Sequence, residues 1–134
     1  MILVDTSVWI EHLRARDAAL VWHLELGEVL MHPWVLGELA CGNLRNRSEV
    51  LSLLQRLPPC RCASNAETLF FIERRRLMGK GIGWVDAHLL ASVALGGTQG
   101  LWTRNQRLQR AAAELGLAAQ ILHPPGNLHD TAPR

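Results

Sequence analysis

Several features that would place a protein of this size in a secreted or membrane class are scarce in the sequence. The 134 residues include three cysteines, Cys41, Cys60 and Cys62, which are too few for a disulfide framework and wrongly spaced for a zinc knuckle. The longest apolar stretch, residues 89–95, contains Ser92 and is far shorter than a membrane span of about 20 residues. The N-terminus, MILVD, lacks the basic region of a signal peptide. We therefore expect a cytoplasmic protein with reduced thiols.

A strong charge of either sign is absent as well. Fourteen basic and twelve acidic residues leave a formal net charge of +2, which does not by itself indicate a nucleic-acid binder. The basic residues are clustered, however. Residues 74–76 are all arginine, and Arg104, Arg107 and Arg110 recur at a spacing that places them along one side of a helix. Each cluster is either a solvated helix face or a surface that positions phosphates.

The composition is that of a folded domain. Apolar residues make up 49% of the chain, which excludes intrinsic disorder, and 134 residues are enough to bury a core without disulfides. Proline and glycine gather near the C-terminus. We therefore expect one domain over residues 1–123 and a loosely ordered tail over residues 124–134.

Apolar runs alternate with helical patterns along the chain. The runs predict strands, and the patterns between them, bounded by capping residues, glycine and proline, predict helices. The expected strands are residues 2–4, 29–31, 60–63 (a weak one), 100–103 and 119–122. The first expected helix begins after residue 5. The others span residues 18–26, 33–44, 49–57, 65–78, 85–95 and 106–115. Such a pattern is typical of an α/β fold, in which a short parallel sheet is covered on both faces by helices.

Three acidic residues lie in unusually apolar surroundings: Asp5, Glu38 and Asp86. A carboxylate in such surroundings costs several kcal/mol unless it is paired, protonated or bound to a cation. Each has a structural alternative. Asp5 can cap the helix that follows it, Asp86 can be stabilised by a helix N-terminus, and Glu38 can pair with Arg45.

Together the three acids predict a metal site. Asp5 directly follows the first strand, and the carboxyl ends of parallel strands are where functional groups gather in such sheets. Oxygen ligands without well-spaced His or Cys suit a hard cation, Mg²⁺ or Mn²⁺. Such an ion, held by carboxylates, activates water for displacement at phosphorus. His88 is two residues from Asp86 and points elsewhere on a helix, so we interpret it as a core or surface residue rather than a ligand.

Four segments resemble the PIN-domain family, specifically the VapC-type toxins of prokaryotic toxin–antitoxin pairs. They occur in the family's order: residues 2–10 (ILVDTSVWI), 34–39 (WVLGEL), 82–91 (IGWVDAHLLA) and 101–108 (LWTRNQRL). The resemblance covers residues 1–123 and implies a PIN-like three-layer α/β/α fold. It further implies an endoribonuclease that cleaves RNA, often tRNA or rRNA, with a metal-activated water. A homodimer and a VapB-type antitoxin are the partners it implies.

The resemblance also assigns roles to residues. Asp5, Glu38 and Asp86 match the acidic metal ligands, and Ser7 and Thr103 match supporting hydroxyls. The fourth position of the family often holds Asp, but this chain has Asn105, which keeps an oxygen ligand and loses a charge. One tightly bound ion is therefore expected rather than two. Arg104 and Arg107 are expected to position phosphates.

Two other functions remain open at this stage. A phosphatase with an aspartyl nucleophile also begins with a strand and Asp, but it needs a second Asp where this chain has Ser7. A PIN-like scaffold that binds RNA or protein without cleavage is the other alternative, and Asn105 is the feature in its favour. Trp9, Trp22 and Trp34, with Val21, suggest an apolar surface for a partner.

Overall fold

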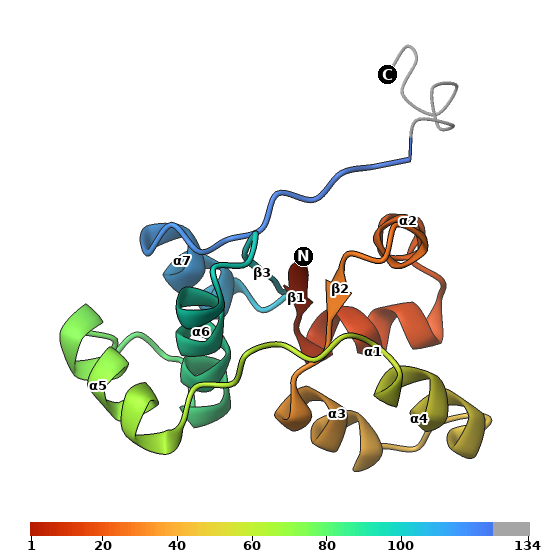
Figure 1. Cartoon of the computed structure of the whole chain (residues 1–134), viewed down its shortest axis with the longest axis horizontal. Helices are drawn as coiled ribbons and strands as arrows, with labels where there is room; N and C mark the ends of the chain where they lie inside the picture. Colours follow the sequence, from red (N-terminus) through yellow and green to blue (C-terminus); the bar gives the residue numbers. More distant parts are fainter. Residues whose placement is uncertain (125–134) are drawn as a thin grey trace.

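The computed structural model describes residues 1–124, and this part of the chain folds as helices around a short sheet (Figure 1). The elements, in chain order, are β1 (Ile2–Val4), α1 (Thr6–Arg14), α2 (Ala18–Glu25), β2 (Val29–Leu30), α3 (Pro33–Ala40), α4 (Arg47–Gln55), α5 (Asn65–Arg75), α6 (Trp84–Gly96), β3 (Leu101–Trp102) and α7 (Gln106–Glu114).

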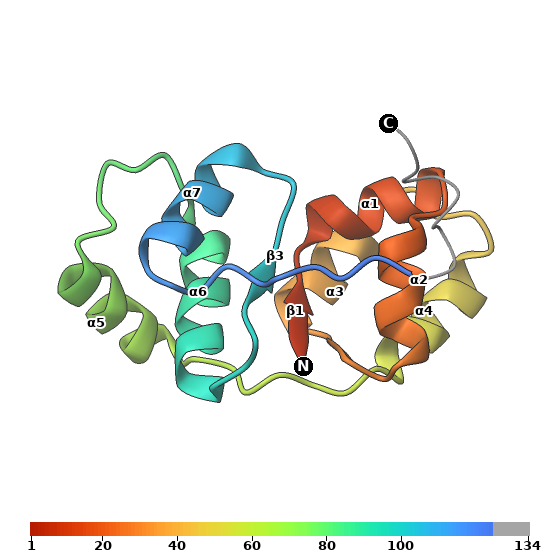
Figure 2. The same ribbon diagram turned by 90° about the horizontal axis from the view of Figure 1, so that it is seen from above.

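The sheet has the order β2-β1-β3, and both pairings are parallel. Ile2 lies opposite Val29, and Leu3 lies opposite Leu30 and Leu101. The sheet separates two helical layers, with α5, α6 and α7 on one side and α1 to α4 on the other (Figures 1 and 2). The expected three-layer α/β/α architecture is therefore confirmed. The strands are apolar throughout because helices cover both of their faces.

Two of the expected strands do not form. Residues 60–63 and 119–122 are irregular, and single bridges stand near them, Met31 with Pro59 and Leu101 with Ala118. Pro59 lacks an N–H group, so it cannot continue a ladder of hydrogen bonds. At the other edge Ala119 N donates to Leu101 O over 3.0 Å, after which the chain leaves the sheet.

The end of α3 and the start of α4 differ from the positions that the sequence predicts. α3 ends at Ala40 rather than residue 44, and the Arg47 guanidinium donates to the carbonyl groups of Ala40 and Gly42. α4 begins at Arg47 rather than at residue 49 and follows Asn46, which has φ of 52°. These ends depend on contacts between residues several positions apart, which local propensity does not contain.

Helix α5 begins at a reciprocal cap and ends earlier than expected. Ser64 accepts from Glu67 N, and the Glu67 carboxylate accepts from Ser64 N, which is a capping box. The helix ends at Arg75 because Arg76 adopts a left-handed conformation with φ of 55°. The arginine run therefore lies at the C-terminus of this helix, where positive charge is favourable.

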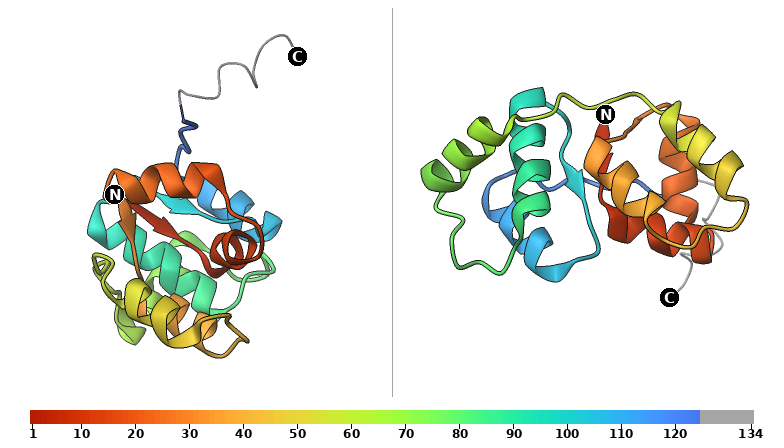
Figure 3. Two further views of the ribbon diagram at one scale, coloured as in Figure 1. Left: turned by 90° about the vertical axis from the view of Figure 1, so that its right-hand side faces the viewer. Right: turned by 90° about the horizontal axis from the view of Figure 1, so that it is seen from below.

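Two long connections cross the molecule. The segment between α4 and α5 passes from one helical layer to the other (Figure 3). The segment after α7 runs across the sheet toward α2, where Leu122 N donates to His23 Nε2 over 3.1 Å (Figure 2). The predicted tail over residues 124–134 lies, apart from its first residue, outside the described residues. No helix within residues 1–124 has both the length and the apolar character that a membrane span requires.

Candidate active site

The candidate site lies at the carboxyl ends of β1 and β3. Asp5 directly follows β1, and Thr103 directly follows β3. Asp5 N donates to Trp102 O over 2.9 Å, so the sheet hydrogen bonding continues one residue beyond the strands and holds Asp5 beside Thr103. Because both strands are buried, this position is fixed by the core.

Two hydroxyl groups orient the Asp5 carboxylate. Oδ2 accepts from Ser7 Oγ and from Thr103 Oγ1, each over 2.7 Å, and the residue is 6% exposed. These hydroxyls are held in turn, because Arg104 N donates to Ser7 Oγ and Asn105 N donates to Thr103 Oγ1. Asp5 occupies the N-cap position of α1, but its side chain makes no capping hydrogen bond. Within residues 1–124, Oδ1 has no hydrogen-bond donor, so it can bind a ligand.

Glu38 approaches the same region from α3. Its Oε1 accepts from Thr6 Oγ1 over 2.5 Å, and its side chain is exposed. The expected alternative, an ion pair with Arg45, does not form. In the part of the chain that the structure describes, no salt bridge involves Glu38, Asp5 or Asp86. Three carboxylates therefore lie near the strand ends without a cationic side chain to balance them.

Asp86 is half-buried in the first turn of α6. Burial raises the pKa of its carboxyl above the ordinary value, the hydrogen bond from Gly83 N lowers that pKa, and the negative charges of Asp5 and Glu38 raise it further. The two other carboxylates are thus within electrostatic range of Asp86. A carboxylate that is both buried and repelled by two others is stabilised by a bound cation.

Aromatic packing joins the two helices that carry Glu38 and Asp86. The ring centroids of Trp34 on α3 and His88 on α6 are 4.2 Å apart, and those of Trp84 and His88 are 4.5 Å apart. His88 is 2% exposed, and its Nδ1 lies 3.1 Å from Thr68 Oγ1. It is a core residue that contacts Trp34 and Trp84, which is one of the two expected alternatives, and its Nδ1 is directed at Thr68 rather than at the carboxylates.

Asn105 has a local structural role. It is exposed and is the N-cap of α7, where its Oδ1 accepts from Leu108 N over 3.0 Å. An Asn side chain has only one oxygen, so metal binding by Asn105 would compete with this cap.

Arg104 and Arg107, the two arginines expected to position phosphates, differ in their surroundings. Arg104 pairs with Glu11 over 2.9 Å and with Asp17 over 2.5 Å, whereas the Arg107 side chain lies against Gly81 and is exposed.

The donor chemistry of the site fits a hard divalent cation. Carboxylate oxygens are the ligands that Mg²⁺ and Mn²⁺ prefer, and these three lack cationic partners within residues 1–124. The sequence predicted the three acids as ligands, and it also predicted Ser7 and Thr103 as supporting hydroxyls, which the structure places against Asp5. It missed Thr6, whose hydroxyl binds Glu38. Its position between Asp5 and Ser7 was the available signal.

Comparison with known proteins agrees with this geometry. Residues 2–114 match the PIN domain, which covers most of the chain, and the chain belongs to the PIN-domain family. Ribonuclease VapC32 of Mycobacterium tuberculosis is 54% identical over 118 residues, and the match covers 88% of this chain and 95% of that protein. The same protein from a second strain, H37Rv, matches to the same extent. The resemblance stated from the four sequence segments is therefore confirmed.

Proposed function

We propose that this protein is an endoribonuclease toxin of the VapC type and that it cleaves RNA with a divalent cation, Mg²⁺ or Mn²⁺. The observation that carries the proposal is that Asp5, Glu38 and Asp86 approach the strand ends and have no salt-bridge partner within residues 1–124. Burial, together with the charges of Asp5 and Glu38, raises the pKa of Asp86, which is consistent with such a group. The family and the high identity to a protein named a ribonuclease support the same reaction.

Each acid has a separable role in this proposal. Asp5 offers Oδ1 to the cation while Ser7 and Thr103 hold Oδ2, so the ligand is oriented before the ion arrives. Glu38 and Asp86 contribute carboxylates from α3 and α6, which meet through the rings of Trp34, Trp84 and His88. When bound, the cation lowers the pKa of water and stabilises charge at the phosphate during displacement.

The RNA would be positioned by basic groups beside the acids. Arg107 is the better candidate, because Arg104 already pairs with two carboxylates and lies 6.0 Å from the Trp102 ring centroid. Arg104 instead connects the loop after β3 to α1 and to the start of α2. Phosphate contacts of this kind add affinity without selecting a sequence, so the choice between tRNA and rRNA belongs to other contacts.

A VapB-type antitoxin and a second copy of the chain are the proposed protein partners. Of the residues expected to form an apolar surface, Trp9 is 3% exposed and belongs to the core, whereas Trp22 and Trp34 are half-buried. More exposed apolar side chains lie on α5, where Leu69 is 57% and Phe70 is 69% exposed. Such a surface is typical of an interface.

The test is cleavage of total RNA by purified protein in Mg²⁺, in Mn²⁺ and in excess chelator. We expect cleavage with either ion and none with chelator. Asp5→Asn is nearly isosteric and removes one ligand charge, so the rate should fall about 100-fold or more, the equivalent of a few kcal/mol of lost stabilisation. Glu49→Gln, at an exposed position on α4, is the matched control and should cleave normally. Cleavage that persists in chelator would contradict the proposal.

A further inference from the structure

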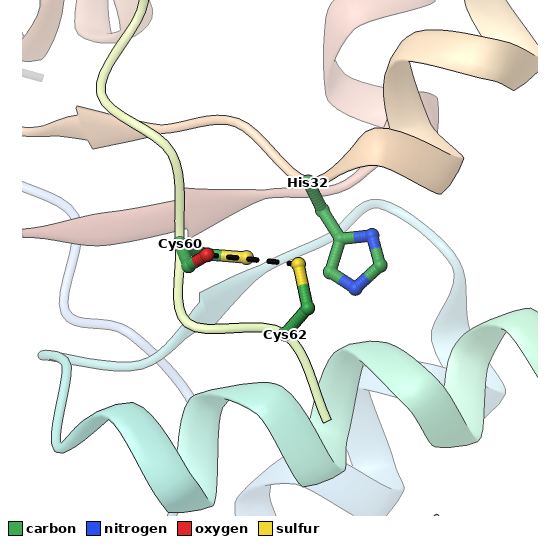
Figure 4. A group of neighbouring side chains, drawn as sticks. All are labelled: His32, Cys60 and Cys62. Carbon is green, nitrogen blue, oxygen red and sulfur yellow. Dashed lines mark hydrogen bonds between the residues drawn. The ribbon is translucent and has the colours of Figure 1, made fainter. Parts of the chain in front are cut away.

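A second group of potential metal ligands lies outside the carboxylate site. His32, Cys60 and Cys62 place their donor atoms within 4.8 Å of one another (Figure 4). Within residues 1–124, no other group of three or more His, Cys, Asp and Glu side chains brings its donor atoms so close together. The carboxylates of the candidate active site do not form a group this tight.

The backbone fixes the segments that carry these side chains. His32 is the N-cap of α3, and the two cysteines lie in the connection between α4 and α5. Met31 N donates to Pro58 O over 2.8 Å, and Cys60 N donates to Met31 O over 3.0 Å. The bridge between Met31 and Pro59, which forms in place of the expected strand, therefore brings His32 next to the cysteines, although His32 is far from Cys60 in the sequence.

We propose that His32, Cys60 and Cys62 bind a thiophilic divalent cation of the Zn²⁺ class. Two sulfur donors and one imidazole suit Zn²⁺ and disfavour the hard ions that carboxylates hold. Cys62 is exposed and provides an entry path, whereas His32 and Cys60 are buried. Three protein ligands leave one tetrahedral position for water or another donor.

The charges balance on binding. Each thiol releases its proton to solvent, so two thiolates and one divalent ion make a site without net charge. A neutral site is compatible with the burial of Cys60, which is 8% exposed, and of His32, which is 1% exposed. Ser92 is a polar neighbour of the group: its Oγ lies 3.3 Å from His32 Nε2 and accepts from Ala63 N.

Metal binding at His32 would alter the start of α3. His32 Nδ1 accepts from Trp34 N over 3.0 Å, which places the ring proton on Nε2. A cation at Nε2 moves that proton to Nδ1, and a cation at Nδ1 occupies the acceptor directly. In both cases the Trp34 N–H loses its partner. The Trp34 amide is therefore a reporter of ligation by His32.

Titration of the full chain with Co²⁺, followed by displacement with Zn²⁺, tests the site. We expect one equivalent of Co²⁺ to give an intense thiolate-to-metal charge-transfer band and tetrahedral ligand-field bands, and Zn²⁺ to abolish both. The carboxylate site cannot produce the charge-transfer band, because it has no sulfur. In ¹⁵N-labelled protein, Zn²⁺ should also shift the Trp34 amide resonance.

Variants make the assignment specific. Cys62→Ser, at an exposed position, should lose the band, and Cys41→Ser, which removes an exposed cysteine outside the group, should keep it. Asp5→Asn should keep it too, which makes the readout independent of RNA cleavage. Absence of the band in the unmodified protein, or its persistence in Cys62→Ser and in Cys60→Ser, would overturn the proposal. A retained band with an unshifted Trp34 amide would remove His32 from the ligand set and overturn the three-ligand site.

Discussion

Asp5 occupies the N-cap of α1, where an Asp side chain ordinarily accepts from the helix backbone. In this protein its hydrogen bonds go instead to Ser7 and Thr103. The helix gives up a contribution of about 1 kcal/mol that such a cap provides. A residue that departs from the local rule for its position is often a functional one, and this observation distinguishes the metal-ligand interpretation of Asp5 from the capping interpretation.

Asn105 shows the opposite arrangement. Its side-chain oxygen caps α7 by accepting from Leu108 N, and this is the role that the local rule assigns. If residue 105 also faces the cation, the single oxygen of Asn must serve both purposes. An Asp at this position has two carboxylate oxygens, so one can cap the helix while the other binds the ion.

The variant Asn105→Asp should therefore bind Mn²⁺ more tightly than the unmodified protein and cleave RNA faster at low metal concentration. An anionic ligand replaces a neutral one beside a divalent cation, whose charge dominates the local field. Calorimetric titration with Mn²⁺, with cleavage measured in parallel, checks both effects. Unchanged affinity and unchanged cleavage would show that residue 105 is not a ligand position.

At the scale of elements, the site depends on how α3 and α6 are packed. Trp34, Trp84 and His88 join the two helices, and Glu38 and Asp86 are carried by the same helices. In the metal-free protein the carboxylates repel one another, so the packing of these helices opposes an electrostatic cost. Removing one of the charges should relieve that cost.

Asp86→Asn should raise the Tm of the metal-free protein at neutral pH. The pKa of Asp86 is raised in the folded state, so folding favours the protonated form, and stability is lost as pH rises through the unfolded pKa toward the folded one. The gain from Asn should therefore be largest at neutral pH and disappear in acid, where both states are protonated. Asn still offers an oxygen to Gly83 N.

Thermal unfolding in chelator, measured at several pH values, checks this sign. Asp17→Asn is the matched control, because hydrogen bonds from Leu20 N and Arg104, together with the Arg104 charge, outweigh burial and lower the pKa of Asp17. That variant should lose stability at neutral pH. A fall in Tm for Asp86→Asn under the same conditions would show that Asp86 is not repelled by its neighbours.

What the sequence could predict at this scale was whatever is encoded locally. Apolar runs and capping residues predicted β1, the helices and the three acids, because each of these signals lies within a few positions. The bridges at Pro59 and Ala118 come from pairings across the fold. The early end of α3 comes with contacts of the Arg47 side chain to the carbonyl groups of Gly42 and Ala40, which lie beyond the range of a local propensity pattern. The closeness of His32 to the cysteines is of the same long-range kind, and the sequence analysis did not predict it.

At the scale of the whole molecule, the strand order places β1 between β2 and β3. Parallel strands end at the same edge, so this order gathers the residues that follow each strand: Asp5 after β1, Thr103 after β3 and α3 after β2. Glu38 and Asp86 then approach from helices at this edge. Chain topology thus explains how residues from distant parts of the sequence reach one edge of the sheet in this member of the PIN-domain family.

The most direct test of the central claim is to locate the cation. A crystal of the protein grown with Mn²⁺ should show an anomalous-scattering peak that is bound by carboxylate oxygens of Asp5, Glu38 and Asp86, because these acids lack cationic partners within residues 1–124. Crystals of Asp5→Asn under the same conditions should lack the peak or show it much weakened. A Mn²⁺ ion bound elsewhere, with the three acids separated and bound to no metal, would contradict the account.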